Sequence, residues 1–510
     1  MIRLVALVAA FFSTIASADA ATISIVSMHY SVGHPVPHLH YDGPTVGGDL
    51  ATLRDMYDTF VKCRISCLGP EGSATAVLTL NGEGGDYHEG LAIADFLREN
   101  HIATVVERGS YCYSACAFAF LGGSGYSSEP GIGSYVDRMV EPGSTVGFHA
   151  PYRNEDAFLA ALEERGAMAT QGDTRDSLAL MVKELVRWNV DPEVLFRMVG
   201  MGPDQTYDLT TAADLFLARV ALPPTPSSAW IVDAPTALRN VCSRLLAIDE
   251  RGDPRDTQWQ LVAEFEKGIG RTATGEVLSG YRLGERPLSI GSCAATDASL
   301  ADPAVFEASL YFTPGLDGSN APGTSFFNRQ DGWSSAGTGS NPLKRILQKG
   351  PLNHFFLPLF DSIDQLDLPG EAAIDANRFN QPISPLLPLM AEELIIDASG
   401  PGSRISHSGD VFVFERVGPR SLFDSALALP GIGRSYTNNA ANEVSFVRDG
   451  AYVDTATPFT WFGMLSGGES LVVEAFVVKP AGVAATEEDM ATLRRVQCAT
   501  DFGGMRLGCS

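Results

Sequence analysis

Two strand-turn-helix units follow one another between residues 77 and 121, and they restrict the fold of this chain more than any other feature. In each unit an apolar run typical of a buried strand leads through a turn into a segment of helical spacing or small residues. We expect strands over 77–80 and 103–106, turns over 81–86 and 109–113, and helices over 90–97 and 114–121. The repetition predicts stacked β-α units around a mixed sheet.

Ser114 stands where the second turn enters its helix. A Ser at a strand-to-helix turn is exposed, and the amides at the helix start can stabilise an oxyanion. Further along, Phe148-His149-Ala150-Pro151 is typical of a strand end, and it contains a histidine. Because a Ser hydroxyl is a poor nucleophile until a neighbouring base accepts its proton, this order indicates serine acyl-transfer chemistry.

The same segments resemble the proteolytic subunit of Clp protease, within the wider crotonase-like superfamily. Residues 81–97 fit the strand, Asn-Ser-Pro-Gly-Gly-Ser turn and helix of that family. Residues 113–117 fit its Ala-Ser-Ala-Ala pattern around the nucleophile, and 138–151 fit the run that carries its general base. The resemblance covers roughly residues 22–220 and implies an α/β domain with a repeated ββα spiral.

Carried over residue by residue, the resemblance makes Ser114 the nucleophile and His149 the base. The amides of Gly85 and Ala115 become the oxyanion hole. Gly84, beside Gly85, lets the backbone approach a substrate closely. The resemblance therefore implies a serine peptidase or related hydrolase that needs no cofactor.

The third member of the catalytic triad is less directly indicated. Aligning Leu209 and Thr210 with the family's Leu-Ser/Thr step puts Thr206 at the position of the acid, flanked by Asp204 and Asp208. Of these we predict Asp204.

Two further departures from the family pattern surround the site. Gly82-Glu83 replaces the Ser-Pro that precedes the family's glycines, which brings a negative charge near the oxyanion loop. An insertion of about ten residues, Tyr126 to Tyr135, separates nucleophile and base, and we expect a rim loop over the site.

A lysine is the alternative base, because relatives of signal peptide peptidase A use a Ser-Lys pair on this fold. Lys62 and Lys183 are the lysines of the first domain, and Lys183 lies on an amphipathic helix expected over 175–188. The Phe-His-Ala-Pro match favours the Ser-His pair instead.

The N-terminus predicts export. Arg3 precedes an apolar run from Leu4 to Phe12, and small residues near Ala20 suit a signal-peptidase cleavage site. No other run approaches the length of a membrane span, so we expect a periplasmic or secreted protein without a span in its mature form.

Eight cysteines, an even number, agree with an oxidising compartment. Proximity suggests four disulfides, although the sequence leaves other pairings open: Cys63 with Cys67, Cys112 with Cys116, Cys242 with Cys293, and Cys498 with Cys509. The second pair brackets Ser114 and would brace its turn. A redox pair is the alternative there, but the spacing is not Cys-x-x-Cys.

The charge balance restricts the partners. The chain carries 61 acidic and 36 basic residues, a formal net charge of −25, and no basic cluster, which argues against nucleic acid. It also lacks a phosphate-binding Gly-x-x-x-x-Gly-Lys loop, and the periplasm lacks ATP. We therefore expect ATP-independent action on accessible peptide segments.

The length of 510 residues suggests two or three domains. We expect a signal peptide over 1–20, an α/β domain over 21–222, a Pro-rich linker over 223–229, and a β-rich region over 230–510. The last region has strand-like runs at 309–312, 410–415, 443–448 and 471–479, and a helix from about 487 to 496 that follows a Thr486-x-x-Asp489 capping box. A long loop or inner boundary is expected near 315–342.

Four histidines near the mature N-terminus are candidate metal ligands: His29, His34, His38 and His40. No carboxylate or Cys completes a recognised ligand spacing, so we predict no metal there.

Two classes of function follow from these observations. One is a periplasmic serine hydrolase, and the other is a catalytically inactive binding or assembly protein that keeps the same fold. The resemblance also suggests a homo-oligomer.

Overall fold

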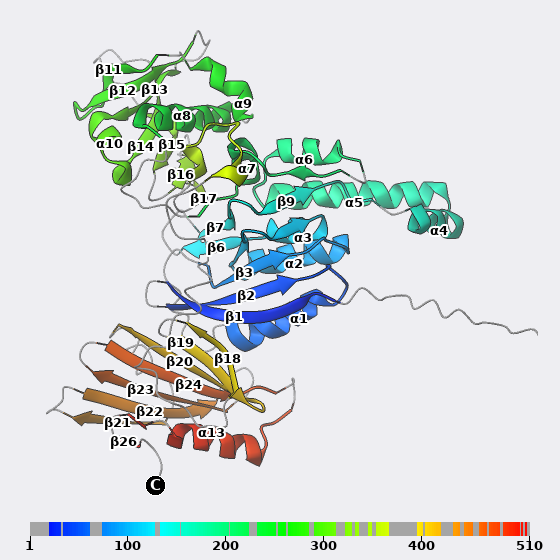
Figure 1. The fold of residues 1–510 in the computed structure, drawn as a ribbon, viewed down its shortest axis with the longest axis vertical. Coiled ribbons are helices and arrows are strands. Elements are labelled where there is room, and N and C mark those ends of the chain that lie inside the picture. Colours follow the sequence, from blue (N-terminus) through cyan, green and yellow to red (C-terminus); the bar gives the residue numbers. More distant parts are fainter. Residues whose placement is uncertain are drawn as a thin grey trace, which may run out of the picture.

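The chain forms three groups of strands in the computed structural model, stacked along its long axis (Figure 1). The N-terminal part builds the middle group, and the two C-terminal groups lie at its opposite ends. The structure describes residues 20–31, 34–61, 74–127, 133–152, 155–202, 205–223, 232–250, 253–261, 264–284, 290–312, 322–328, 332–335, 345–348, 353–366, 395–400, 403–419, 432–438, 443–451, 458–466, 469–479, 483–499, 501–502 and 505–506.

The central sheet has a parallel core. Its described strands, in spatial order, are β1 (Thr22–Ser31), β2 (His34–Asp42), β3 (Ala76–Asn81), β4 (Ile102–Val106) and β8 (Arg138–Val140). Strands β2, β3, β4 and β8 run parallel, and β1 pairs antiparallel with β2. Every residue of β4 is buried, as expected for a strand covered on both faces.

A second, smaller sheet carries the segments around Ser114 and His149. Its order is β10 (Tyr207–Asp208), β9 (Thr145–Phe148) and β5 (Tyr111–Tyr113). Strands β5 and β9 are parallel, with Tyr113 opposite Gly147, and β10 pairs antiparallel with β9.

Helices α1 (Asp49–Met56), α2 (Tyr87–Glu99) and α3 (Ala115–Phe120) pack beside these strands, and a π-helical turn, η1 (Tyr57–Val61), extends α1. Asp86 caps α2, because its carboxylate accepts hydrogen bonds from the amides of His88 (2.8 Å) and Glu89 (3.1 Å). Every residue of α3 is buried, in agreement with its wholly apolar composition.

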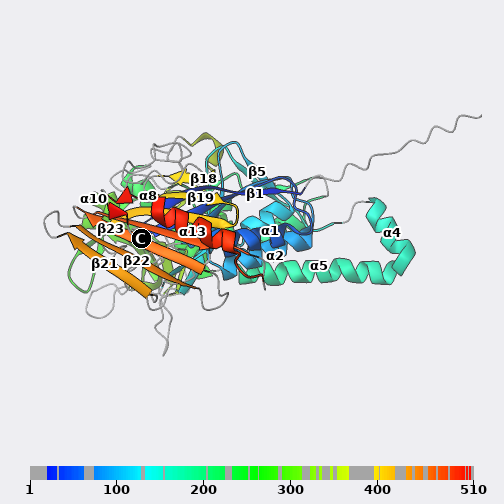
Figure 2. The ribbon, with the colours of Figure 1, turned by 90° about the horizontal axis from the view of Figure 1, so that it is seen from below.

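A helical arm projects from the middle group, as Figures 1 and 2 show. It consists of α5 (Ala167–Arg187), with α4 (Glu155–Arg165) at its far end. At its base, Arg187 Nη1 pairs with Asp95 Oδ1 at 2.9 Å, and the buried Trp188 donates to the same carboxylate oxygen at 3.2 Å. Two short helices follow, α6 (Pro192–Val199) and α7 (Ala212–Ala218).

The next group is built around α8 (Ala234–Glu250), which buries Ala237, Leu238, Val241 and Leu245. A disulfide between Cys242 and Cys293 ties α8 to β13. The strands of this group are β11 (Glu266–Arg271), β12 (Val277–Arg282), β13 (Ile290–Thr296), β14 (Glu307–Phe312), β15 (Pro322–Asn328), β16 (Gly332–Ser335) and β17 (Arg345–Gln348). Its short helices are α9 (Pro254–Thr257), η2 (Gln258–Gln260), α10 (Asp297–Ala301), η3 (Pro303–Val305), η4 (Asn353–Phe355) and η5 (Ile363–Gln365).

The segment 353–366 returns to the middle group. The amides of Ala212 and Ala213, in the first turn of α7, donate to the carbonyls of Asp361 (3.3 Å) and Leu359 (3.1 Å). The amide of Ile363 in turn donates to the Thr210 carbonyl at 2.9 Å. The C-terminal region therefore supplies acceptors that the start of α7 needs.

The third group is an antiparallel sheet with α13 (Glu487–Ala499) beside it (Figure 1). Its strands are β18 (Ile395–Gly400), β19 (Ser403–Ser408), β20 (Val411–Pro419), β21 (Ile432–Asn438), β22 (Glu443–Ala451), β23 (Pro458–Ser466) and β24 (Glu469–Val477), and a small pair follows, β25 (Asp501–Phe502) and β26 (Met505–Arg506). The capping box before α13 is present, since the Asp489 carboxylate accepts from the amide and hydroxyl of Thr486 at 2.7 Å each.

The mixed α/β class and the strand-rich C-terminal region are confirmed. The predictions of two loops are wrong in part. The turn expected over 109–113 contains β5, and the loop expected over 315–342 contains β15 and β16, because both segments find strand partners elsewhere in the chain. None of the helices in the described ranges combines the length and apolar character needed to cross a bilayer.

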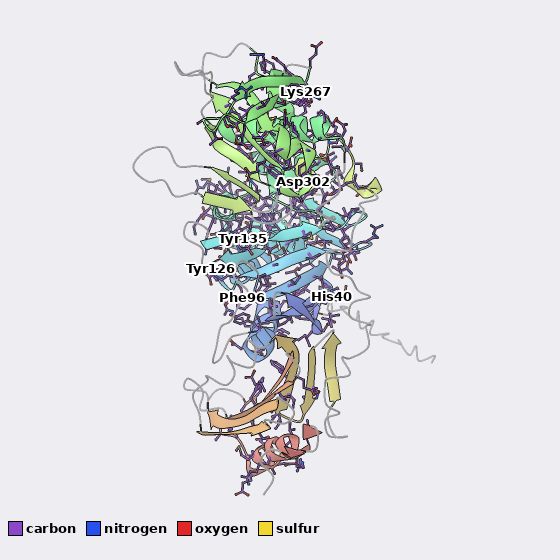
Figure 3. The ribbon with its side chains drawn as sticks, turned by 90° about the vertical axis from the view of Figure 1, so that its left-hand side faces the viewer. His40, Phe96, Tyr126, Tyr135, Lys267 and Asp302 are labelled. Carbon is purple, nitrogen blue, oxygen red and sulfur yellow. A yellow bond between two sulfur atoms is a disulfide. The ribbon has the colours of Figure 1, made fainter. Side chains whose placement is uncertain are left out.

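The described residues of the insertion from Tyr126 to Tyr135 form strands and not the expected rim loop. Its described residues belong to a hairpin of β6 (Ser124–Ser127) and β7 (Gly133–Val136). The Tyr126 ring lies 5.0 Å from His101, just before β4 begins, whereas Ser114 lies at the other end of α3. In Figure 3, Tyr126 and Tyr135 lie toward one side of the middle group and His40 toward the other. Strand β7 pairs with β17 and so joins the hairpin to the C-terminal sheet.

Candidate functional site

Ser114 occupies a backbone conformation that residues other than glycine rarely adopt. Its φ is 53° and its ψ is −120°, between the end of β5 and the start of α3. Its amide donates to the Gly147 carbonyl at 3.0 Å, and its carbonyl accepts from the Phe118 amide at 3.0 Å. Such strain persists only where the surroundings enforce it, and it clusters at functional sites, so the turn makes Ser114 a candidate functional residue.

A disulfide closes this turn. Cys112 in β5 and Cys116 in α3 are bonded, with their Cα atoms 5.2 Å apart, and both side chains are fully buried. The predicted pairing around Ser114 is therefore confirmed, as is that of Cys242 with Cys293. Cys63, Cys67 and Cys509 lie outside the described residues, as does the side chain of Cys498.

Gly84 lies directly against the Ser114 turn. A Cβ at this position would be 2.6 Å from the Tyr113 carbonyl oxygen and 2.7 Å from Ser114 Cβ, and its φ is +92°. Both observations require glycine here. The loop over 82–86 therefore lies beside the start of α3.

The two predicted oxyanion donors are amides without backbone acceptors. Within the described part of the chain, neither Gly85 nor Ala115 donates to a main-chain carbonyl. Ala115 is the first residue of α3, where amides have no intrahelical partner. These donors are available to a developing negative charge.

Packing explains why glycine, and not the Ser of the Clp protease pattern, occupies position 82. A Cβ at Gly82 would be 2.3 Å from the Gly43 carbonyl oxygen, so the Ser of the family pattern does not fit there. The backbone of Gly82 still pairs with β5 in a parallel bridge to Cys112: its carbonyl accepts from the Tyr113 amide, and its amide donates to the Tyr111 carbonyl. Glu83 is exposed.

His149 follows the last residue of β9, just as Ser114 follows the last residue of β5. Because β5 and β9 are parallel neighbours, both side chains start from the same edge of the small sheet. His149 Nδ1 lies 2.9 Å from the Ala150 carbonyl oxygen. A carbonyl can only accept, so the proton is on Nδ1, and Nε2 keeps the lone pair that a general base needs.

The predicted acid, Asp204, lies outside the described residues. Thr206 and Asp208 are described, and Asp208 in β10 stands opposite Gly147 of β9. Asp208 Oδ1 would be 2.4 Å from a Cβ on Gly147, and this oxygen is buried with no hydrogen-bond donor among the described residues. Burial raises the pKa of Asp208, a hydrogen bond from Thr206 lowers it, and the negative Asp364 raises it.

The alternative base is placed elsewhere. Lys183 lies on α5 with its side chain 72% exposed, and its Nζ pairs with Glu184 Oε1 at 3.1 Å. Lys62 lies outside the described residues. An exposed, ion-paired ammonium does not have the desolvated environment of a lysine base.

The N-terminal histidines belong to the first two strands. His38 Nε2 and His40 Nδ1 both contact the Thr79 hydroxyl, at 3.0 and 2.7 Å. The register of β1 and β2 puts His29 opposite Val36 and His34 opposite Ser31. In the described ranges no three metal-ligating side chains gather into a site.

Aromatic residues that were not predicted to have a role border the site. The Tyr152 ring lies 5.0 Å from the His149 ring and is 52% exposed. Tyr111 and Tyr113 flank the Ser114 turn, with their rings 5.8 Å apart. Tyrosines stand next to both the Ser114 motif and the His149 motif in the sequence. A partly apolar surface at the site could have been predicted from them.

Comparisons with known proteins give little further information. No family model and no curated protein matches the chain. Among solved structures, a mutant of the 1510-N membrane-bound stomatin-specific protease is similar to 23% of this chain, with 16% identity and a TM-score of 0.16. The match spans about half of that protein, 49% of its length.

Proposed function

We propose that this protein is an ATP-independent serine hydrolase, most simply a peptidase, that acts outside the cytoplasm. The observation that carries the proposal is the strained backbone of Ser114, with φ 53° and ψ −120°, at a strand-to-helix junction. A serine held in this way presents its hydroxyl at the start of a helix, as in other hydrolases with a nucleophile turn. The Clp protease-like ββα spiral over residues 21–222 is part of this proposal.

In the proposed mechanism, Ser114 Oγ attacks a substrate carbonyl while His149 Nε2 takes its proton. The carbonyl oxygen becomes an oxyanion, which the amides of Gly85 and Ala115 stabilise by about 2.7–4 kcal/mol per donor. His149 then protonates the leaving amine, and an acyl-enzyme forms on Ser114. Water, deprotonated by His149, releases the acid product, and Asp204 is the proposed carboxylate behind His149.

The proposed location is the periplasm or the exterior, reached with the N-terminal signal peptide. The disulfides Cys112–Cys116 and Cys242–Cys293 support it, because such bonds persist in oxidising compartments. The substrate would be an accessible peptide or protein segment.

The competing proposal is a non-catalytic binding or assembly protein with the same fold. One observation favours it: His149 Nδ1 contacts a main-chain carbonyl rather than a carboxylate. A serine hydrolase usually places a carboxylate behind its histidine.

Labelling with a fluorophosphonate probe decides between the two proposals. We expect the purified, oxidised protein to be labelled at Ser114, and expect Ser114→Ala and His149→Ala to lose the label. Ser110→Ala and His88→Ala are matched controls, because these residues lie near the site without a proposed role, and they should keep it. Failure of the folded wild-type protein to react would favour the non-catalytic proposal.

A further inference from the structure

The segment 206–208 runs along the edge of β9 that leads to His149. Tyr207 stands opposite Phe148, and Asp208 opposite Gly147, in an antiparallel pair. Extending this register by one residue puts Thr206 opposite His149. Side chains alternate along a strand, so Thr206 and Asp208 project from the same face as Gly147 and His149.

Asp208 faces the site rather than the core. Its Oδ1 lies over Gly147, where a Cβ on that glycine would also come within 2.6 Å of the Tyr113 ring. Tyr207, the residue between, points to the other face, where its hydroxyl donates to Asp214 Oδ1 at 2.8 Å. The absence of a side chain at Gly147 therefore makes room for the Asp208 carboxylate beside the Ser114 turn.

Asp208 Oδ1 is a buried acceptor that no donor in the described residues satisfies. Buried acceptors without partners are rare, and they often mark positions with a catalytic role. The charged and titratable groups around this carboxylate are Tyr113 of β5 and Asp364 of η5. Neither of these groups in the described part of the chain is a cation, so neither neutralises the charge of the Asp208 carboxylate.

We propose that Asp208 is the carboxylate that positions His149, acting through the Thr206 hydroxyl. The Thr206 hydroxyl donates a hydrogen bond to the Asp208 carboxylate and accepts one from His149 Nδ1. For this, the His149 ring rotates, so that Nδ1 leaves the Ala150 carbonyl and donates to the Thr206 hydroxyl instead. The imidazolium that forms when His149 takes the Ser114 proton is then stabilised by the negative charge behind Thr206. This inference rests on the proposed function and replaces Asp204 as the acid.

The rate of fluorophosphonate labelling of Ser114, measured from pH 5 to 9, tests the proposal on the full-length oxidised protein. We expect Asp208→Asn and Thr206→Val to lower the maximal rate about 10- to 100-fold. We also expect the pH of half-maximal rate to fall in both variants, because the carboxylate favours the protonated ring. A residue that only stabilises the fold would not move this pH.

Two variants serve as controls. Thr206→Ser keeps the hydroxyl and should label at nearly the wild-type rate, and Ser110→Ala, which has no proposed role, should label like the wild type. Should Asp208→Asn fail to fold, the contrast between Thr206→Val and Thr206→Ser still decides the proposal.

The outcomes separate the two proposals. Normal labelling of folded Asp208→Asn overturns the role of Asp208 and leaves the hydrolase intact, and loss of labelling in Asp204→Asn alone assigns the acid to Asp204. Absence of labelling in the wild-type protein overturns the hydrolase proposal, and this inference with it.

Discussion

Ser114 holds its backbone angles because several contacts act on the same turn. The carbonyl of Gly147, the amide of Phe118 and the Cys112–Cys116 disulfide each fix one part of it. Gly84 completes the arrangement by leaving room for the turn. The motif around Ser114 and the glycines of the neighbouring loop could be predicted from the sequence, because each depends on residues close together in the chain.

The proposed acid of the triad could not be predicted from the sequence to the same degree. Choosing among Asp204, Thr206 and Asp208 requires the register of β10 on β9, and this register arises from pairing between segments about 60 residues apart. Likewise, the preference for glycine at position 82 comes from Gly43, which no local pattern connects to it.

Gly84→Ala tests the close approach of the Gly84 backbone to Tyr113 and Ser114. The added Cβ would clash with the Tyr113 carbonyl and Ser114 Cβ at a φ of +92°, so we expect a loss of stability of about 1–3 kcal/mol and slower labelling of Ser114. Gly109→Ala is the matched control, because Gly109 also has a positive φ of +81° but nothing within 4 Å. It should lose stability without losing reactivity; equal labelling of both variants would contradict the proposed geometry. Chemical denaturation and probe labelling measure the two effects.

His354 predicts a dependence of stability on pH. Its ring is fully buried with both nitrogens unpartnered in the described residues, and burial, with Arg244 and Arg219 nearby, holds its pKa well below 6.5. Below pH 6.5 the unfolded chain therefore binds a proton that the folded protein does not. Stability present above this pH is lost as the pH falls, by about 1.4 kcal/mol per pH unit.

His354→Phe removes this titration, so its free energy of unfolding should fall less steeply between pH 6.5 and 5 than that of the wild type. His88→Ala, which changes an exposed ring, should keep the wild-type slope. Parallel slopes for the wild type and His354→Phe would show that other groups govern acid unfolding.

At the scale of elements, the two disulfides act differently. Cys112 and Cys116 are four residues apart and close a small loop around Ser114, whereas Cys242 and Cys293 are 51 residues apart and join α8 to β13. From loop length alone, the first bond stabilises the fold by about 2 kcal/mol and the second by about 4 kcal/mol.

We therefore expect opposite rankings for stability and reactivity when each pair is replaced by serines. The Cys242/Cys293 double variant should be the less stable in denaturation but should keep Ser114 labelling. The Cys112/Cys116 double variant should be the more stable of the two but should label slowly, because the turn is no longer braced. A fully reactive Cys112/Cys116 variant would assign that bond to folding alone.

The regular elements show where prediction from sequence works. Strands β3 and β4 and helix α2 lie where the apolar patterns placed them, because a buried run or an apolar helix face is a local signal. Strand β5 and hairpin β6–β7 were missed, since they are short, partly polar segments whose pairing partners are distant in sequence.

At the scale of the whole molecule, the N-terminal part depends on the segment 353–366. This segment provides carbonyl acceptors to the first turn of α7, and its Ile363 amide donates a hydrogen bond to the Thr210 carbonyl. The domain boundary near 222, proposed from the Pro-rich linker, divides the sequence but leaves these contacts across it.

Comparing two fragments tests this dependence. We expect fragment 21–222 to unfold at a lower denaturant concentration than fragment 21–366, because it loses the acceptors for the amides of Ala212 and Ala213 and the β17 partner of β7. Urea denaturation followed by circular dichroism measures the difference. Equal midpoints would show that residues 21–222 form an autonomous domain.

Hairpin β6–β7 also has an evolutionary consequence. The hairpin belongs to the N-terminal part of the sequence, but it extends the C-terminal sheet that contains β17, because Val136 pairs with Gln348. Recombination that exchanged the C-terminal half for another module would leave the edge of β7 unpaired and open to aggregation. The two halves are therefore expected to be inherited together, and a lineage that loses one of them should lose the hairpin as well.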